Sequence, residues 1–378
     1  MTDAKTALIS AQKPAHSATR AGGLEGTVVA DSELSAVDGE RGRLILRGFS
    51  LETLAPRAAL EDVASLLWHG VLPEPGDRTM QRAFAEARKR AFALLPQLGG
   101  ALALPDAMES LRAAVAQVAT NEPDESLGAT LAGAVAVFAA AGARCAAKEA
   151  PIPPDPALSH AADYLRMLRG AKPDEAAERA LSSYLVTVAD HGMNASTFAA
   201  RVVASTGSDA VSAVVAGIGA LKGPLHGGAP GPVLDMLDAI GSPERASAWL
   251  EGELAAGRRI MGMGHRVYRV RDPRAAVLEA AILRLEQRHT QGGRLPLARA
   301  VERAATELLA KRYPERPLRA NVEFYTAVLL DALGLERRLF TPTFAVGRVV
   351  GWYAHIEEQR RTGRLIRPAS RYVGPEPA

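Results

Sequence analysis

Residues 127–147 form an alanine-rich, mostly apolar stretch with the sequence LGATLAGAVAVFAAAGARCAA. A helix over this stretch is hydrophobic on nearly every side, so it lacks the polar face that a surface helix presents to water. The stretch therefore predicts a central, buried helix around which other helices pack. Aromatic residues make up only 5% of the chain, which also favours close-packed helices over sheets.

Apolar residues recur at helical spacing from Leu60 onward. Before them, residues 24–49 carry several glycines, acids that include Asp31, Glu33, Asp38 and Glu40, and a short apolar run, which together predict one short antiparallel β element. The predicted fold class is thus mainly α, with little sheet elsewhere. We expect helices over residues 60–69, 78–95, 107–119, 127–147, 159–169, 174–188, 212–221, 230–240, 243–256, 322–333 and 343–359, with more between residues 275 and 312.

Length and composition limit the class of protein. A chain of 378 residues exceeds one ordinary core and predicts two domains, or one large domain with an insertion. The formal charge of +3 does not indicate nucleic acid. The single cysteine, Cys145, excludes an internal disulfide and a multi-cysteine zinc site, and it favours a cytoplasmic location. No hydrophobic run has transmembrane length, and the first twenty residues lack the apolar core of a signal peptide, so we expect no membrane partner.

His226 lies in a glycine- and proline-rich segment, residues 223–233, with the sequence GPLHGGAPGPV. The apolar residues 212–221 before it predict a buried helix, and the prolines after it fit the first turn of a new helix. Just before a helix N-terminus, backbone N–H groups and the helix dipole disfavour a protonated imidazole. A neutral imidazole there can donate a hydrogen bond to a carbonyl oxygen. The alternative is a turn histidine that only caps the helix.

Residues 260–275, IMGMGHRVYRVRDPRA, place His265 after two glycines and surround it with four arginines against one acid, Asp272. Phosphate and carboxylate groups fit the fork of an arginine side chain. The segment therefore predicts a site for an anionic ligand, and a solvated basic loop is the alternative.

Two further residues stand out on predicted helices. Glu323, in NVEFY, falls in the first turn of a helix that Asn321 can cap, where the helix dipole stabilises a carboxylate; this explanation is purely structural. Arg348 is the only charge in residues 340–354, FTPTFAVGRVVGWYA. A buried arginine is costly unless it is paired or faces a ligand, so we expect a partner for Arg348 rather than an exposed guanidinium.

Motifs of several enzyme classes are missing. The chain has no GxSxG, HExxH or Walker A motif, and the glycines of residues 217–223 follow no predicted strand, which argues against a dinucleotide site. His191, His226, His265 and Glu323 are chemically able to hold a metal, but their spacing matches no recognised ligand pattern. We therefore predict no metal site.

Taken together, these stretches resemble the citrate synthase family in its short bacterial form, which includes 2-methylcitrate synthases. The segments DHGMNASTFAARVVAST, GPLHGGA, MGMGHRVYRVRDPRA, NVEFYTAVLLDALG and RLIRPASRYVG occur in the family's order, and the resemblance covers about residues 24–374. It implies a mostly helical homodimer. A small domain, residues 227–333, would interrupt a large one, residues 24–226 and 334–378, after a loose tail over residues 1–23.

The resemblance also implies roles for individual residues. His226 matches the histidine that hydrogen-bonds the acetyl-CoA thioester oxygen, His265 matches the one that polarises the oxaloacetate carbonyl, and Glu323 stands where the family has its carboxylate base. The other matches bind substrate: His191, Arg274, Arg348 and, from the neighbouring subunit, Arg367 for oxaloacetate, and Arg269, Gly262 and Gly264 for CoA.

The implied activity is that of a citrate synthase, a transferase of the tricarboxylic acid cycle. It would condense acetyl-CoA with oxaloacetate and hydrolyse citryl-CoA, without a metal or redox cofactor. A 2-methylcitrate synthase that uses propionyl-CoA and a catalytically weak regulatory paralogue are the alternatives. Three departures bear on this choice: Glu323 replaces the usual aspartate, Gly192 replaces a common glutamate, and residues 230–232 replace the usual NEA. Near-attack geometry is sensitive to shifts of about 1 Å, so either the pocket fits the longer acid or turnover is weak.

Overall fold

The computed structural model describes residues 23–24, 26–120, 124–228, 230–288 and 293–375. The chain divides into two compact units, residues 1–31 and residues 32–378. In the first unit the described residues form no helix or strand. Except for Gly23, which is exposed, the predicted loose tail lies outside the described residues.

A small antiparallel sheet opens the second unit. Its strands are β1 (Ser35–Asp38), β2 (Arg43–Leu46) and β3 (Phe49–Ser50), in the order β1-β2-β3. Ser35 pairs with Leu46 in the register of β1 and β2. The sheet confirms the short β element predicted between residues 24 and 49.

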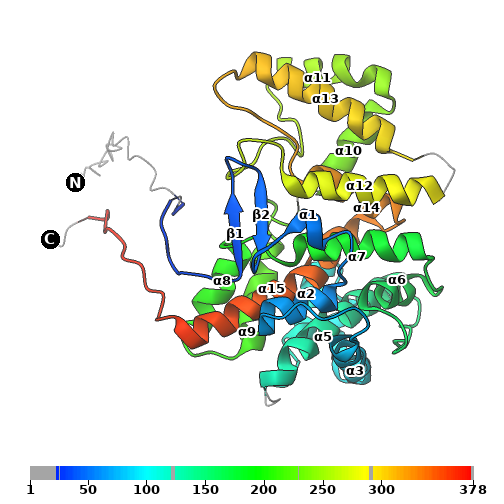
Figure 1. Ribbon diagram of the computed structural model, residues 1–378, viewed down its shortest axis with the longest axis vertical. Coiled ribbons are helices and arrows are strands. Elements are labelled where there is room, and N and C mark those ends of the chain that lie inside the picture. Colours follow the sequence, from blue (N-terminus) through cyan, green and yellow to red (C-terminus); the bar gives the residue numbers. More distant parts are fainter. Residues whose placement is uncertain (1–22, 25, 121–123, 229, 289–292, 376–378) are drawn as a thin grey trace, which may run out of the picture. The chain divides into compact units, whose positions relative to one another are not determined.

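Helices make up most of the second unit and confirm the predicted fold class (Figure 1). The α-helices are α1 (Leu51–Leu54), α2 (Leu60–His69), α3 (Thr79–Leu94), α4 (Ala107–Val115), α5 (Asp124–Ala146), α6 (His160–Arg169), α7 (Glu175–Ala189), α8 (Ala195–Ala204), α9 (Ala210–Leu221), α10 (Pro230–Ile240), α11 (Ala246–Ala255), α12 (Pro273–Arg288), α13 (Leu295–Arg312), α14 (Val322–Ala332) and α15 (Phe340–Thr362). Short 3-10 helices are η1 (Leu95–Gln97), η2 (Gly99–Ala103), η3 (Pro243–Arg245) and η4 (Arg337–Leu339).

The helix α5 is the buried helix that the alanine-rich stretch predicts. It packs against α3, α4, α6 and α15, and the side chains from Leu131 to Ala141 are all buried. Residues 126–146 are long and apolar enough to cross a membrane, so the expectation that no run reaches this length was wrong. Of the apolar window, 83% is buried inside the protein, which is typical of a core helix.

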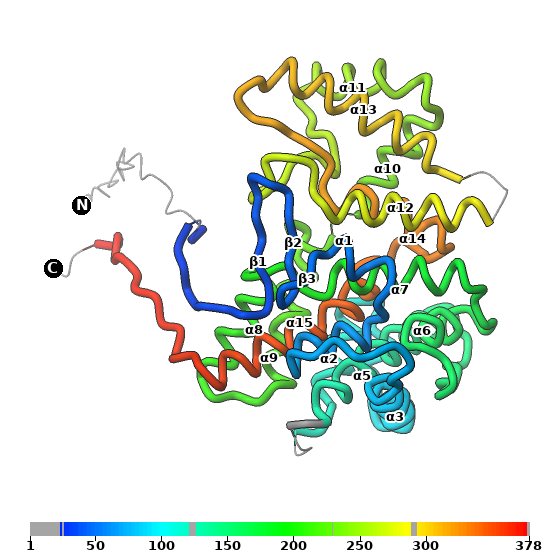
Figure 2. The backbone as a smooth tube through the Cα atoms, in the orientation of Figure 1, coloured from blue at the N-terminus to red at the C-terminus, as the bar shows by residue number. Residues whose placement is uncertain are grey.

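The helix α15 brings distant segments together. It packs against α2, α5, α7, α8 and α9, and Figures 1 and 2 show it among these helices. Two glycines let it approach α7 closely. A Cβ atom at Gly347 would lie 2.7 Å from the carbonyl oxygen of Leu185, and one at Gly351 would collide with the carbonyl oxygen of Ala189. This close packing places Arg348 beside the end of α7.

The helices α10 to α14 pack on one another, and α12 packs almost as extensively on α7 as on α14. The turn between β1 and β2 also reaches this part of the chain. The backbone N–H of Arg269 donates to the carbonyl oxygen of Gly39 at 3.0 Å, and a Cβ atom at Gly42 would lie 2.6 Å from Cγ2 of Val270. The hairpin therefore contacts the segment that precedes α12, where His265 lies.

Candidate active site

Two glycines shape the segment that carries His265. Gly262 and Gly264 have φ values of +71° and +90°, which side chains other than glycine adopt at a cost. The carbonyl oxygen of Gly262 accepts the backbone N–H of Asn321 at 3.0 Å, and the Gly264 N–H donates to the carbonyl of Arg319 at 2.7 Å. These bonds hold His265 close to the start of α14, the helix whose second residue is Glu323.

The hydrogen bonds of His265 define which nitrogen carries its proton. Nδ1 accepts the backbone N–H groups of Val267 at 3.0 Å and Tyr268 at 3.1 Å. Burial and the charge of Arg274 lower the pKa of His265 to about 4, so the imidazole is neutral at pH 7 and carries its proton on Nε2. Nε2 lies 3.3 Å from Nη2 of Arg274. Because both atoms are donors, the pair suits an oxygen acceptor.

Arg274 is itself buried and paired with Asp272, which lies in the same segment. Asp272 also accepts the backbone N–H of Val322 at 3.1 Å, at the N-terminus of α14. One buried carboxylate thus fixes both the guanidinium beside His265 and the helix that carries Glu323.

Glu323 is more than a first-turn carboxylate. Asn321 caps the helix as predicted, because its Oδ1 accepts the backbone N–H of Glu323 at 3.0 Å. The side-chain atom Oε2 of Glu323 is buried and has no hydrogen-bond partner among the described residues. Burial raises the pKa of Glu323 to about 7, although the charges of Arg274 and Arg348 act to lower it. A carboxyl group that titrates near neutral pH is suited to general-base chemistry.

Arg348 is 1% exposed. Its Nε donates to the carbonyl oxygen of Val188 at 2.5 Å, and its guanidinium carbon lies 4.8 Å from the ring centre of Phe344. Burial lowers the pKa of Arg348 to about 10. Its Nη1 is buried without a partner in the described part of the chain, as is the hydroxyl of Tyr184 on α7. Arg348 thus has a partner, as expected, because its Nε is bonded to the carbonyl oxygen of Val188. Its Nη1 remains available to bind an anionic ligand.

His226 lies in the turn after α9, four residues before α10 begins. Burial, followed by the charges of Arg348 and Arg274, lowers its pKa to about 4. The neutral imidazole is therefore as predicted, but burial and two arginines account for it. Its Nε2 lies 2.8 Å from the hydroxyl of Ser196 on α8, which also accepts the indole N–H of Trp352 at 3.1 Å.

His191 follows α7 by two residues and is buried. Its Nε2 lies 3.1 Å from the hydroxyl of Tyr268, and its ring centre lies 5.6 Å from that of His265. Burial and then the charge of Arg274 lower the pKa of His191 well below its ordinary value. The ring is therefore a neutral neighbour of the other two histidines.

Six of the predicted residues thus converge: His191, His226, His265, Arg274, Glu323 and Arg348. Two others do not join them. Arg269 is exposed and touches the hairpin through its backbone, and Arg367 is exposed in the extended segment after α15. Ser196 and Tyr268 are site residues that we did not predict. Both lie in segments that carry the resemblance, but their roles depend on partners 30 and 77 residues away in the sequence, which no local pattern indicates.

Within the described residues, no group of three or more histidine, cysteine, aspartate or glutamate side chains is arranged to hold a metal ion.

The chain matches known proteins over most of its length. The family model described as "Citrate synthase, C-terminal domain" matches residues 23–369. The chain is 37% identical to the citrate synthase of Haloferax volcanii over 93% of this chain and 95% of that protein. It is 36% identical to the 2-methylcitrate synthase of Mycobacterium tuberculosis, over 94% and 90% respectively. The citrate synthase of Thermoplasma acidophilum, solved with carboxymethyl coenzyme A and oxaloacetate, superposes with a TM-score of 0.84 at 29% identity, over 94% of this chain and 96% of that one.

Proposed function

The chain belongs to the citrate synthase family, and we propose that it joins acetyl-CoA to oxaloacetate and hydrolyses the resulting citryl-CoA to citrate and CoA. The observation that supports this most is the buried, unpartnered carboxyl oxygen of Glu323, whose pKa responds to Arg274 and Arg348, the same two arginines that act on the neutral His226. The reaction needs such a base together with two uncharged donors. No metal or redox cofactor enters the proposal, and the cytoplasm and the tricarboxylic acid cycle are its proposed setting.

Enolisation is the first step. A thioester methyl group is a very weak acid, so its proton leaves only if a carboxylate is aimed at it while a donor stabilises the enol oxygen. Glu323 takes the proton, and His226 donates to the thioester oxygen. The donor must be Nδ1, because Nε2 faces Ser196. The hydroxyl of Ser196 also lies 2.8 Å from Oδ1 of Asn194, and that oxygen accepts a hydrogen bond from the backbone N–H of Thr197 at 3.2 Å. The hydroxyl can therefore rotate and donate its proton to Nε2 of His226, because Oδ1 of Asn194 keeps its bond to Thr197.

Oxaloacetate is the electrophile in the second step. The proton on Nε2 of His265 polarises its ketone oxygen, and Arg274, Arg348 and His191 hold its carboxylates. The unpartnered Nη1 of Arg348 supports this arrangement. We propose that the protein is a homodimer in which Arg367 of each chain completes the neighbouring site. The exposed position of Arg367 is compatible with that role.

Coenzyme A would lie along the segment before α12, in contact with Arg269, Gly262 and Gly264. We propose that residues 227–333 act as a small domain that closes on residues 24–226 and 334–378 once oxaloacetate is bound. Closure would exclude water before the carbon–carbon bond forms. The mutual packing of α10 to α14 supports this division.

A second candidate is 2-methylcitrate synthesis from propionyl-CoA, which the Mycobacterium tuberculosis relative favours. One methylene is worth only about 1–3 kcal/mol in a pocket, so the shared site serves either acyl group. Parallel kinetics with the two acyl-CoAs at saturating oxaloacetate separate the candidates. We expect a higher kcat/KM for acetyl-CoA, and a higher value for propionyl-CoA would reassign the substrate. Thermal stabilisation by oxaloacetate without turnover would indicate the regulatory paralogue instead.

A further inference from the structure

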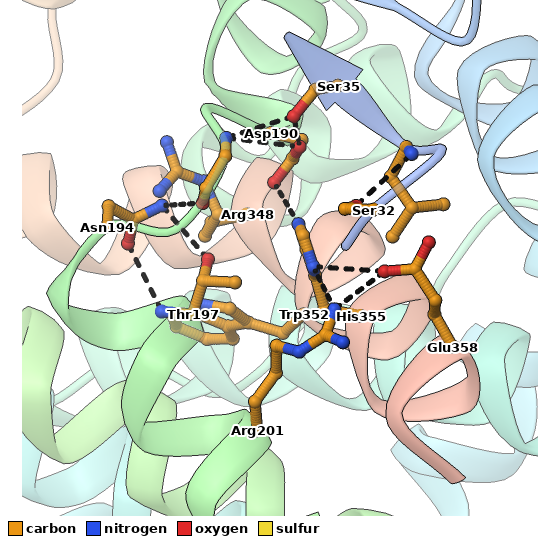
Figure 3. Close-up of polar contacts among 12 residues, drawn as sticks. Ser32, Ser35, Asp190, Asn194, Thr197, Arg201, Arg348, Trp352, His355 and Glu358 are labelled. Carbon is orange, nitrogen blue, oxygen red and sulfur yellow. Dashed lines mark hydrogen bonds and ion pairs between the residues drawn. The ribbon is translucent and has the colours of Figure 1, made fainter. Parts of the chain in front are cut away.

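A second buried polar cluster joins Arg201, His355 and Asp190, the residue next to His191 in the sequence (Figure 3). Its centre is Arg201 on α8, which is 0% exposed. Nη1 of Arg201 donates to Oε2 of Glu358 at 2.6 Å, and Nε donates to Oε1 of Gln359 at 2.9 Å. Nη1 also lies 3.0 Å from Nδ1 of His355 on α15. The cluster therefore ties α8 to the last turns of α15.

The cluster has a direction, because a guanidinium only donates hydrogen bonds. Nδ1 of His355 must accept from Arg201, so a neutral His355 carries its proton on Nε2. Nε2 lies 3.1 Å from Oδ1 of Asp190, and both side chains are fully buried. Hydrogen bonds thus run from Arg201 through His355 to Asp190.

Asp190 stands immediately before His191 in the sequence, at the end of α7. Its Oδ2 accepts the hydroxyl of Ser35 on β1 and the backbone N–H of Gly192, the latter at 3.3 Å. Burial by itself would raise the pKa of Asp190, but His355, Arg348 and Ser35 outweigh it and hold the pKa at about 2. A full negative charge is therefore buried next to Arg348 and one residue from His191.

The turn that Asp190 holds connects two parts of the site. Gly192 has a φ of +58°, and its N–H also donates to the Ser35 hydroxyl at 3.0 Å. Asn194, two residues later, caps α8 just before Ser196, the partner of His226. A shift of this turn would therefore move His191 directly and Ser196 through the helix cap.

We propose that Asp190, oriented by His355, is a positioning residue for oxaloacetate: it fixes the turn that carries His191 and supplies the counter-charge that keeps Arg348 in place. This inference rests on the proposed function. Asp190 contacts no reacting atom in it and acts through its two neighbours.

The first test is Asp190→Asn, which keeps the shape of the side chain. An amide has one acceptor oxygen, so it cannot accept from His355 on one side and from Gly192 and Ser35 on the other. We expect the KM for oxaloacetate to rise about 10- to 100-fold, in line with the cost of breaking a buried charged hydrogen bond. The KM for acetyl-CoA should change less than about threefold, because Asp190 contacts none of the residues that we propose to bind CoA.

His355 offers a pair of variants for a second test. The side-chain amide of His355→Gln can still donate to Asp190, whereas His355→Leu cannot. We expect His355→Gln to keep much of the affinity for oxaloacetate. His355→Leu should lose about as much affinity as Asp190→Asn does. These variants also carry the test if Asp190→Asn does not fold.

The chain supplies a matched control in a remote cluster. Asp163 accepts from Nε of Arg88 at 2.7 Å, and Nη1 of Arg88 lies 3.2 Å from Nδ1 of His160, with all three side chains fully buried. Asp163→Asn therefore breaks a similar cluster away from the turn at Asp190. We expect it to lower the melting temperature and to leave the KM for oxaloacetate unchanged.

Calorimetric titration of the wild type and the variants with oxaloacetate separates the two proposals. If the wild type binds oxaloacetate but turns over neither acyl-CoA, the proposed function fails, and the positioning role still requires weaker binding in Asp190→Asn. If Asp190→Asn and Asp163→Asn lose similar stability and both bind oxaloacetate like the wild type, the positioning role is overturned. A wild type that neither binds nor turns over oxaloacetate overturns both.

Discussion

Arg274 meets Asp272 through two hydrogen bonds, from Nη2 to Oδ2 at 2.7 Å and from Nε to Oδ1 at 3.0 Å. Their side chains are only 4% and 0% exposed. The bidentate contact sets the plane of the guanidinium, while the N–H of Val322 ties the same carboxylate to α14. The relative position of His265 and Glu323 therefore depends on Asp272, a residue that we assign to no step of the reaction.

Asp272→Asn should damage both stability and binding. Breaking a buried ion pair by removing one charge typically costs about 3–5 kcal/mol, because the other charge stays buried and unpaired. We expect the free energy of unfolding to fall by about this amount and the KM for oxaloacetate to rise about 100-fold. Urea unfolding and steady-state kinetics measure the two effects. A variant with wild-type KM would show that Arg274 does not depend on Asp272 for its orientation.

Gly351→Ala should disrupt the packing that places Arg348. The new Cβ atom would collide with the carbonyl oxygen of Ala189, so α15 and α7 must move apart. We expect a loss of about 1–3 kcal/mol, the usual cost of overpacking, together with weaker oxaloacetate binding. Gly219→Ala on α9 is the control, because its Cβ atom would meet nothing within 4 Å. That control should gain about 0.5–1 kcal/mol of stability from the higher helix propensity of alanine, and equal behaviour of the two variants would contradict the packing argument.

Much of the fold was predictable because the signals are local. Gly70 ends α2 in the left-handed conformation, and Asp174 and Asn321 cap their helices as their residue types indicate. The helix α8 was not predicted, because the face that it buries carries Ser196, Thr197 and Arg201 and so does not form an apolar stripe in the sequence. The helix α15 begins at Phe340 rather than Thr343, since Pro342 is tolerated in its first turn.

The site was predictable only in part. As the only charge in an apolar helix, Arg348 was predicted to have a partner. The sequence did not indicate that this partner is the carbonyl oxygen of Val188, 160 residues away. The same holds for Asp190 and His355, whose contact joins segments 165 residues apart. Tertiary packing alone brings such pairs together. Arg367 stays a prediction, because its proposed role needs a second chain.

Glu323 should make the reaction depend on pH near neutrality. The base must be ionised, and burial raises its pKa to about 7 in the free protein. We expect kcat/KM for acetyl-CoA to fall about tenfold per pH unit below pH 7 and to level off above it. A pH profile that is flat between pH 5.5 and 8.5, both about 1.5 units from that pKa, would contradict the assignment of Glu323 as the base.

The same pKa shift has a consequence for stability. Because the pKa of Glu323 is raised above its ordinary value of 4.5, the folded protein favours the protonated form. The resulting stabilisation is present below the unfolded pKa and is lost as the pH rises through about 7. Urea unfolding at a series of pH values should therefore show the wild type losing stability relative to Glu323→Gln, by an amount on the order of 3 kcal/mol.

The most direct test of the proposed function is the release of CoA from acetyl-CoA by the wild type and by Glu323→Gln, with and without oxaloacetate. We expect the wild type to release CoA only when oxaloacetate is present, and citrate to form in equal amount. Removal of a general base typically costs 10²–10⁴-fold, so Glu323→Gln should lose about 1,000-fold in kcat while its melting temperature falls no lower than that of the wild type. Turnover by Glu323→Gln within tenfold of the wild type would contradict the assignment of Glu323 as the base. A wild type that releases no CoA with oxaloacetate would contradict the proposed function.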